Sequence, residues 1–156
     1  TINLFKIARP NDKNINIGIA DKIGEDFYYQ SSHINQANSF KHYDNWKKVK
    51  IQITTLDNII KDLEIKKIDF LNIDVEYRDF KALQGLNLNN VRPSLIAIED
   101  NDAYDIADVT NSDIYKYMTN NEYFLYSKLN CTNFYLDKRY KSNLNDILNT
   151  QNKNSL

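Results

Sequence analysis

Apolar and polar residues alternate along parts of the chain in a way that predicts β-strands. Residues 14–17 of the segment 14–21 (NINIGIAD) alternate between polar and apolar, and residues 49–54 (VKIQIT) alternate throughout. Residues 25–30 (EDFYYQ) follow a turn at Gly24 and are predicted to form another strand. Residues 68–75 (IDFLNIDV) and 94–99 (SLIAIE) are almost continuously apolar. Such runs are typical of parallel strands that are covered on both faces.

The spacing of apolar residues also predicts three helices. Leu56, Ile59, Ile60 and Leu63 lie on one face of a helix that Thr55 can cap. Two further helices are expected over residues 77–86 and 112–120, and two closing strands over 122–127 and 132–136. Apolar strands that alternate with amphipathic helices indicate an α/β fold with a mostly parallel sheet and an antiparallel closing strand.

The polar segments complete the organisation of the chain. Residues 31–45 lack periodicity and are expected to form a long loop, which carries His33 and His42. We expect both histidines to be solvated, and we assign no metal site. Residues 1–140 are expected to form one domain, and residues 141–156 a polar tail.

Composition and charge exclude several classes of protein. The 156 residues include 20 Lys and Arg against 21 Asp and Glu, and this balance argues against a nucleic-acid-binding protein. No apolar run approaches the roughly 20 residues of a membrane helix, so no membrane partner is expected. Cys131 is the only cysteine, and no start resembling a signal peptide is present. We therefore expect a cytoplasmic protein.

Acidic residues follow three of the predicted strands, and they are the candidates for chemistry. Asp21 follows the first strand, Asp74 and Glu76 end the second, and Glu99 and Asp100 end the third. Ligands of open α/β sheets bind at the carboxyl ends of the strands, so these carboxylates are expected along one edge. They can accept hydrogen bonds from hydroxyl groups or an amine, hold a divalent cation, or act as a general base. The alternative, ordinary solvated strand ends, stays open.

The order of several short motifs adds a resemblance to a known family. Residues 68–99 contain Ile-Asp-Val-Glu at 73–76, Ala-Leu-Gln-Gly at 82–85, Arg-Pro at 92–93 and Ile-Glu at 98–99. Upstream stand Arg-Pro at 9–10, NINIGIA at 14–20 and Ile-Thr-Thr-Leu at 53–56. This ordered set, from about residue 4 to 136, resembles the FkbM-type methyltransferases, which use S-adenosylmethionine and mostly methylate hydroxyl groups of sugars and polyketides.

The resemblance implies a Rossmann-like class I methyltransferase sheet and a set of site residues. Asp74 and Glu76 would be catalytic, with Glu76 as the base. Ala20, Asp21 and Asp74 would contact S-adenosylmethionine, whereas Glu76, Tyr77 and Glu99 would contact the acceptor. That acceptor would be a small molecule or glycan with a free hydroxyl group.

The sequence also departs from the family pattern. Tyr77 stands where the family has glycine. The family's first strand, its D-x-G-A-N turn and its acidic second strand have no counterpart, and the first residue is Thr1 rather than Met. We therefore expect a sheet that is incomplete at its amino-terminal end: either the chain is part of a longer protein, or it folds as a reduced sheet with an exposed edge. The strand before Asp74 should have an unpaired side, which could join a second copy of the chain in a homo-oligomer.

Two other interpretations remain at this stage. The chain could be a degenerate module that has lost the cofactor site and serves in protein interactions. It could also bind or modify sugars through its carboxylates without the cofactor.

Overall fold

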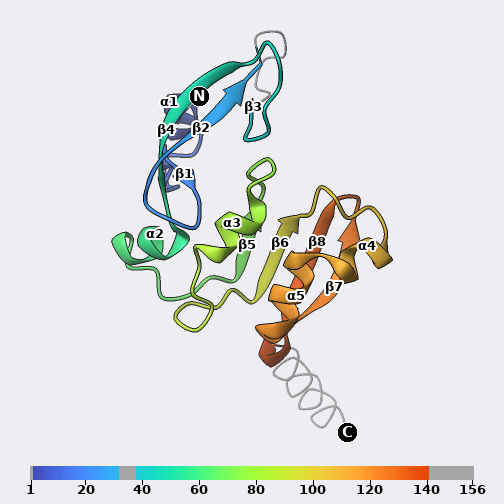
Figure 1. The fold of residues 1–156 in the computed structure, drawn as a ribbon. Coiled ribbons are helices and arrows are strands. Elements are labelled where there is room, and N and C mark those ends of the chain that lie inside the picture. Colours follow the sequence, from blue (N-terminus) through green and yellow to red (C-terminus); the bar gives the residue numbers. More distant parts are fainter. Residues whose placement is uncertain (1, 32–37, 141–156) are drawn as a thin grey trace, which may run out of the picture.

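The structure, a computed structural model, describes residues 2–31 and 38–140 (Figure 1). Its helices are α1 (Ile2–Ala8), α2 (Leu56–Asp62), α3 (Asp79–Gln84), α4 (Ile106–Asn111) and α5 (Asp113–Asn120). Its strands are β1 (Gly18–Ile19), β2 (Gly24–Gln30), β3 (Asn38–Ser39), β4 (Lys47–Thr54), β5 (Phe70–Ile73), β6 (Leu95–Glu99), β7 (Tyr123–Leu129) and β8 (Thr132–Asp137). The predicted tail, residues 141–156, and His33 lie outside the described residues. No described helix is both long enough and apolar enough to cross a membrane.

The strands form two separate four-stranded sheets, so the mixed α/β class is confirmed. Sheet A has the order β1-β4-β2-β3, and sheet B has the order β5-β6-β8-β7. Among the described strands, β1–β4 and β5–β6 pair in parallel, whereas the other four pairs are antiparallel. The prediction of one mostly parallel sheet is therefore wrong for the described residues.

The physical reason is that short connections favour antiparallel neighbours. The β7–β8 connection is too short for the crossover that parallel strands need, and Asn130 turns the chain there with a φ of 54°. Strand β2 pairs with β4 along its whole length, from Gly24 opposite Ile53 to Gln30 opposite Lys47. Strand β1 then adds to β4 rather than to β5, which separates Asp21 from the strand before Asp74.

Strand β5 has a partner on one side only, as expected from the sequence. It pairs with β6, and no other described strand pairs with it. Strand β1 likewise ends sheet A. Both sheets therefore present an open edge within the described part of the chain.

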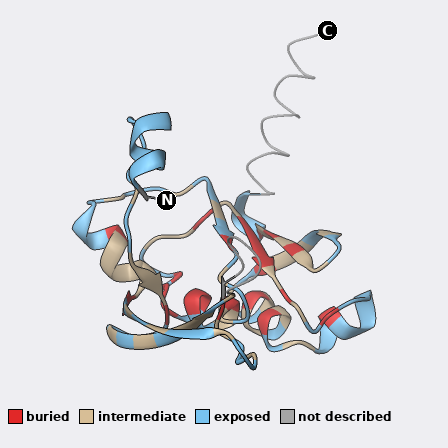
Figure 2. Cartoon of the chain, turned by 90° about the horizontal axis from the view of Figure 1, so that it is seen from above, coloured by how far each residue is buried: buried red, intermediate tan, exposed pale blue. Residues whose placement is uncertain are grey.

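The hydrophobic core lies around sheet B. Helices α3 and α5 contribute Leu83 and Met118, and the sheet contributes Ile73, Ile96 and Tyr135, all of which are buried. Figure 2 shows the buried residues concentrated on these elements, whereas α1 is exposed along its described residues. The core therefore holds β5, β6 and α3 in place, and these elements carry the predicted carboxylates.

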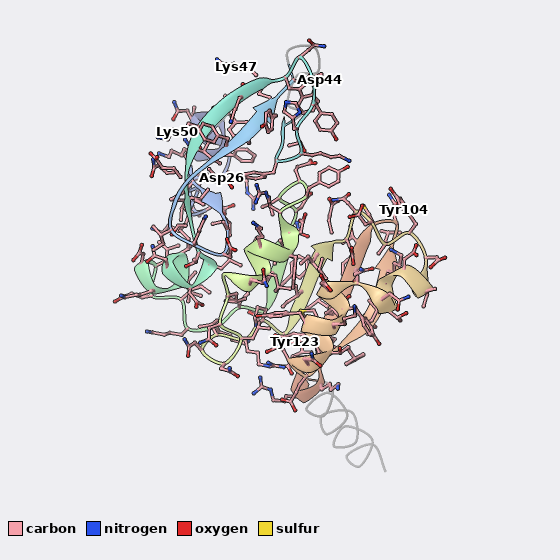
Figure 3. All side chains as sticks on the ribbon, viewed as in Figure 1. Asp26, Asp44, Lys47, Lys50, Tyr104 and Tyr123 are labelled. Carbon is pink, nitrogen blue, oxygen red and sulfur yellow. The ribbon has the colours of Figure 1, made fainter. Side chains whose placement is uncertain are left out.

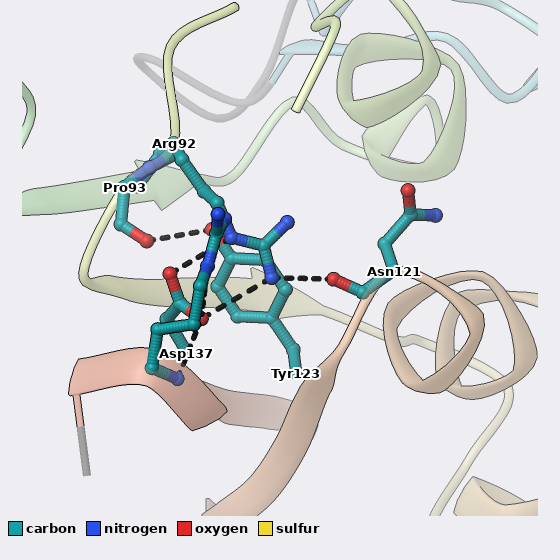
Figure 4. Close-up of polar contacts among 6 residues, drawn as sticks. Arg92, Pro93, Asn121, Tyr123 and Asp137 are labelled. Atoms are coloured by element: carbon teal, nitrogen blue, oxygen red, sulfur yellow. Dashed lines mark hydrogen bonds and ion pairs between the residues drawn. The ribbon is translucent and has the colours of Figure 1, made fainter. Parts of the chain in front are cut away.

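A buried ion pair locks the end of sheet B that is opposite those carboxylates. The Arg92 side chain donates from Nε to Asp137 Oδ2 at 2.8 Å, and it also donates to the Asn121 carbonyl (Figure 4). Its guanidinium lies 4.4 Å from the centre of the Tyr123 ring, whose hydroxyl donates to the Pro93 carbonyl at 2.6 Å. The Arg-Pro motif thus connects the beginnings of β6 and β7 with the end of β8.

Candidate functional site

Three carboxylates converge at the carboxyl ends of β5 and β6. Asp74 directly follows β5, Glu99 is the last residue of β6, and Asp79 is the first residue of α3. One oxygen atom from each lies within 4.8 Å of the others. Strands β5 and β6 are parallel neighbours, so their ends meet at one edge, and the proximity of Asp74 and Glu99 follows from that register.

Asp79 is the member of this group that the sequence interpretation missed. Its side chain is only 4% exposed, and its Oδ1 accepts a hydrogen bond from the Val75 backbone at 2.9 Å. Burial raises its pKa to about 6, to which the negative charges of Glu99 and Asp74 contribute. An aspartate in the first turn of a helix just after a strand was the signal that could have identified it.

Glu76 lies close enough to the same group for the charges of Asp74 and Glu99 to act on its carboxylate. Burial raises the pKa of Glu76 above its ordinary value, and the neighbouring carboxylates Asp74 and Glu99 raise it further. A carboxylate with a raised pKa is a stronger base than a solvated one. Glu76 is therefore suited to accept a proton from a bound hydroxyl group.

The loop between Asp74 and Asp79 has a strained backbone. Glu76 and Tyr77 have φ angles of 52° and 73°, in the left-handed region that favours glycine. The resemblance noted in the sequence leads us to expect glycine at position 77, and Tyr77 adopts a left-handed backbone despite its side chain. The strain of one such residue is on the order of 1–2 kcal/mol.

Contacts with sheet A hold this loop from the other side. The Phe40 backbone donates to the Glu76 carbonyl at 3.3 Å, and Arg78 forms an ion pair with Asp26 at 3.5 Å. The Lys41 ammonium lies 5.0 Å from the centre of the Tyr77 ring. Asp26 is labelled on sheet A in Figure 3. Residues of β2 and of the segment after β3 thus hold the loop in its strained form.

Two pockets flank the loop. The first, here called the acidic pocket, has a volume of about 370 Å³ and lies between the start of α3, the end of β6 and the junction of α4 with α5. Its lining includes Tyr77 and the carboxylates of Asp79, Glu99, Asp100, Asp102 and Asp113. The second, here called the strand pocket, has a volume of about 620 Å³ and is lined by β1, β4, Val75 and Glu76.

Of the three residues predicted to contact the cofactor, Asp74 belongs to the carboxylate group, whereas Ala20 and Asp21 lie apart from it. Ala20 is buried at the end of β1, where its carbonyl oxygen touches Gly85 at the far end of α3 from Asp79. Asp21 is exposed and follows a strand of sheet A. The structure therefore brings together Asp74, Glu76 and Glu99, but it does not bring Asp21 to the same edge.

His42 and Cys131, two other side chains that could have carried chemistry, make ordinary structural contacts. His42 is exposed and meets the Tyr29 ring edge-on, with 4.9 Å between the ring centres. Cys131 is half-buried, and its thiol donates to Glu99 Oε1 at 3.5 Å. Burial and the charge of Glu99 raise the pKa of this thiol, which disfavours the reactive thiolate.

Comparison with families of known proteins gives a match over residues 3–125 to the methyltransferase FkbM domain. The chain belongs to the FkbM methyltransferase domain family. Neither the curated proteins nor the solved structures gave a match. The family assignment agrees with the motifs at 73–76, 82–85 and 92–93, of which the last forms the buried ion pair of this FkbM domain.

The surroundings of the glycines indicate whether this FkbM domain has a glycine-rich turn for a nucleotide-like cofactor. A Cβ at Gly18 would press on Ile51 and Ile53, and one at Gly85 would collide with Ala20. Gly24 has a φ of 150° at the start of β2. Packing or a turn therefore accounts for each glycine, and none belongs to a glycine-rich turn that would cradle a cofactor, although Gly18 also lines the strand pocket. The described residues thus provide a group of carboxylates but no glycine-rich turn of the kind that binds a nucleotide-like cofactor.

Proposed function

We propose that this FkbM domain is part of an S-adenosylmethionine-dependent O-methyltransferase that acts on a hydroxyl group of a sugar or another small natural product. The group of Asp74, Asp79 and Glu99 at the ends of β5 and β6 carries the proposal. Carboxylates at such strand ends suit a hydroxylated ligand, because they accept hydrogen bonds from its hydroxyl groups.

Each residue of the site has a distinct part in this proposal. Glu76 accepts the proton of the acceptor hydroxyl, and its raised pKa makes it a competent base. Asp74 and Glu99 orient the acceptor through hydrogen bonds. Asp79 is a positioning residue, because it holds the Val75 backbone and thereby the loop that carries Glu76.

We further propose that the two sheets are the flanking parts of one Rossmann-like sheet. The open edges of β1 and β5 support this idea, because each ends its sheet among the described strands. The strand pocket is lined by β1 on one side and by Val75 and Glu76 on the other. Strands from another segment of the protein, or from a second copy, would pair with these edges and supply the glycine turn.

Calorimetric titration with S-adenosylmethionine and a methyl-transfer assay test this function in the protein that contains this chain. Asp74→Ala and Glu76→Gln should each abolish methyl transfer while cofactor binding is retained for Glu76→Gln. Asp69→Asn is the matched control, because Asp69 is an exposed carboxylate at the other end of β5. Unchanged turnover in Glu76→Gln would remove Glu76 as the base.

A second candidate function is a non-catalytic interaction module. The glycine contacts favour it, because packing or a turn accounts for all three glycines and none belongs to a glycine-rich turn. Tyr77 favours it as well, because this ring stands at the acidic pocket where the family has glycine. Absence of S-adenosylmethionine binding in the whole protein would support this second function and contradict the first.

A further inference from the structure

Arg78 connects the loop between Asp74 and Asp79 with sheet A. It is the capping residue before α3, yet its side chain forms no capping hydrogen bond and lines neither of the two pockets that flank the loop. Instead its Nη2 atom lies 3.5 Å from Asp26 Oδ2, and its Cζ atom lies 5.3 Å from the centre of the Phe40 ring. Asp26 belongs to β2 and is labelled in Figure 3. The Arg78 side chain is thus a bridge from the loop to sheet A.

The ion pair between Arg78 and Asp26 is better shielded from water than the adjacent ion pair on β2. Its two side chains are 29% and 28% exposed, whereas those of Lys50 and Glu25 are 55% and 48% exposed. The Asp26 carboxylate is also held by the Phe27 backbone, which donates to Oδ1 at 2.7 Å and leaves Oδ2 for Arg78. Water and salt screen a half-buried pair less than an exposed one, so this bridge holds its geometry better.

Phe40 links this bridge directly to Glu76. Its backbone N–H donates to the Glu76 carbonyl at 3.3 Å, while its ring lies beside the Arg78 guanidinium. Glu76 needs such support, because its φ of 52° is unfavourable for a residue with a side chain. Without these contacts the loop would relax to a more favourable backbone and carry the Glu76 carboxylate away from Asp74 and Glu99.

We propose that Arg78 is a positioning residue, which holds the loop so that the Glu76 carboxylate stays close to the carboxylates at the ends of β5 and β6. Arg78 acts through its contacts with Asp26 and Phe40 and not by touching a ligand. This inference rests on the proposed function, because it names the residue that keeps the proposed base in place. Sheet A therefore contributes to the site by fixing its geometry.

Replacement of Arg78 by methionine tests this role, with a carbon-13 NMR titration of the Glu76 carboxyl group in the chain as the measurement. In the parent protein, burial raises the pKa of Glu76, and the charges of Asp74 and Glu99 raise it further. In Arg78→Met the released Glu76 carboxylate gains water, so its pKa should fall toward the ordinary value. If Arg78 acted only through its charge, its loss would instead raise the pKa of Glu76, because a positive charge favours the ionised carboxylate. An unchanged or higher pKa in the variant would overturn the proposal.

A matched pair of variants on β2 separates this bridge from the other ion pair of the strand. Asp26→Asn removes the charge that faces Arg78 but keeps an oxygen for its own backbone hydrogen bond. It should lower the pKa of Glu76, as Arg78→Met does, and speed amide hydrogen exchange at Phe40 at least fivefold. Glu25→Gln breaks the adjacent, more exposed ion pair on the other face of the strand and should change neither quantity. Equal effects of the two variants would contradict a specific bridge.

A double variant and a distant amide exclude a general loss of stability. Asp26→Asn combined with Arg78→Met should have no larger effect than Arg78→Met alone, because both substitutions break the same contact. Additive effects would contradict the bridge. The Ala20 amide, which donates to the Thr54 carbonyl at 2.8 Å, should keep its exchange rate in each single variant. Equal acceleration at Ala20 and Phe40 would overturn the positioning role in favour of a loosened fold.

These NMR measurements need neither cofactor nor acceptor, so they decide the role of Arg78 independently of the proposed function. Calorimetric titration of the whole protein with S-adenosylmethionine tests that function separately. Absence of binding there would contradict the methyltransferase activity and leave the position of Glu76 as the NMR titration finds it. Cofactor binding together with a Glu76 pKa that does not respond to Arg78→Met would overturn only the positioning role.

Discussion

Replacement of Asp79 by asparagine tests the electrostatic description of the site most directly. Asparagine keeps an oxygen that can accept the hydrogen bond from the Val75 backbone, but it cannot ionise. The folded-state pKa of Asp79, about 6, lies above the ordinary value of 3.8. The folded protein therefore holds this proton more tightly than the unfolded chain does.

The sign and size of the effect follow from this difference. Asp79 contributes its full stability below about pH 4, and that contribution is lost as the pH rises through about 6. A difference of about 2 pKa units corresponds to about 3 kcal/mol in the free energy of unfolding. The Asp79→Asn protein has no such loss, so it should gain up to about 3 kcal/mol over the parent protein between pH 4 and pH 8.

Urea denaturation followed by circular dichroism at several pH values measures this gain. The difference between variant and parent is the useful quantity, because burial also raises the pKa of Glu76 and Asp100, which affects both proteins. The exposed Asp69→Asn variant should show a difference that does not change with pH. A flat difference for Asp79→Asn as well would refute the assignment of a buried, repelled carboxylate.

Three further substitutions test the packing around the site. Arg92→Met leaves the Asp137 carboxylate buried with only the exposed Arg139 beside it and should lower the free energy of unfolding by about 3 kcal/mol in urea denaturation. Tyr77→Gly should be more stable than Tyr77→Ala by about 1 kcal/mol, because both remove the ring but only glycine favours a φ of 73°. Gly85→Ala forces a methyl group against the Ala20 carbonyl and should cost about 2 kcal/mol.

Each of these three variants is compared with a control variant or with the parent protein. Lys67→Met breaks an ion pair with Asp69 in which both side chains are 75% exposed, and it should cost less than about 1 kcal/mol. Equal losses for Lys67→Met and Arg92→Met would contradict the importance of burial. Equal melting temperatures for Tyr77→Gly and Tyr77→Ala would show that the backbone at Tyr77 carries no strain. A Gly85→Ala protein as stable as its parent would contradict the close approach to Ala20.

The sequence predicted local structure well where one face of an element is buried. The alternation in residues 49–54 and the apolar spacing from Leu56 correspond to β4 and α2, and the two predicted closing strands are β7 and β8. Helix α4 was missed because it is short, although Asp105 and Asp108 form a capping box that marks its start. Only Gly18 and Ile19 of the predicted first strand have a strand partner among the described residues.

Pairing between strands is where the sequence was least informative. Periodicity shows which face of a strand is buried, but it does not show which strand lies beside it. Asp74 and Glu99 were correctly expected together because a helix connects β5 to β6, which favours a parallel pair. Asp21 was expected with them, but β1 pairs with β4 instead. Asp79 was missed because its place in the first turn of α3 is a weak local signal, and its raised pKa depends on burial, which the sequence does not show.

The features that cost stability are concentrated between the open strand β5 and the start of α3. Strand β5 pairs with only one other strand in the described part of the chain, Glu76 and Tyr77 are strained, and Asp79 is a buried carboxylate that neighbouring charges repel. A segment that served only the fold would tolerate glycine and asparagine at positions 77 and 79, since both substitutions relieve an unfavourable interaction. Strain and repelled charge are typical of sites where geometry serves binding or catalysis. If Asp79→Asn stabilises the protein and also weakens ligand binding, the cost in stability at Asp79 has its reason in function.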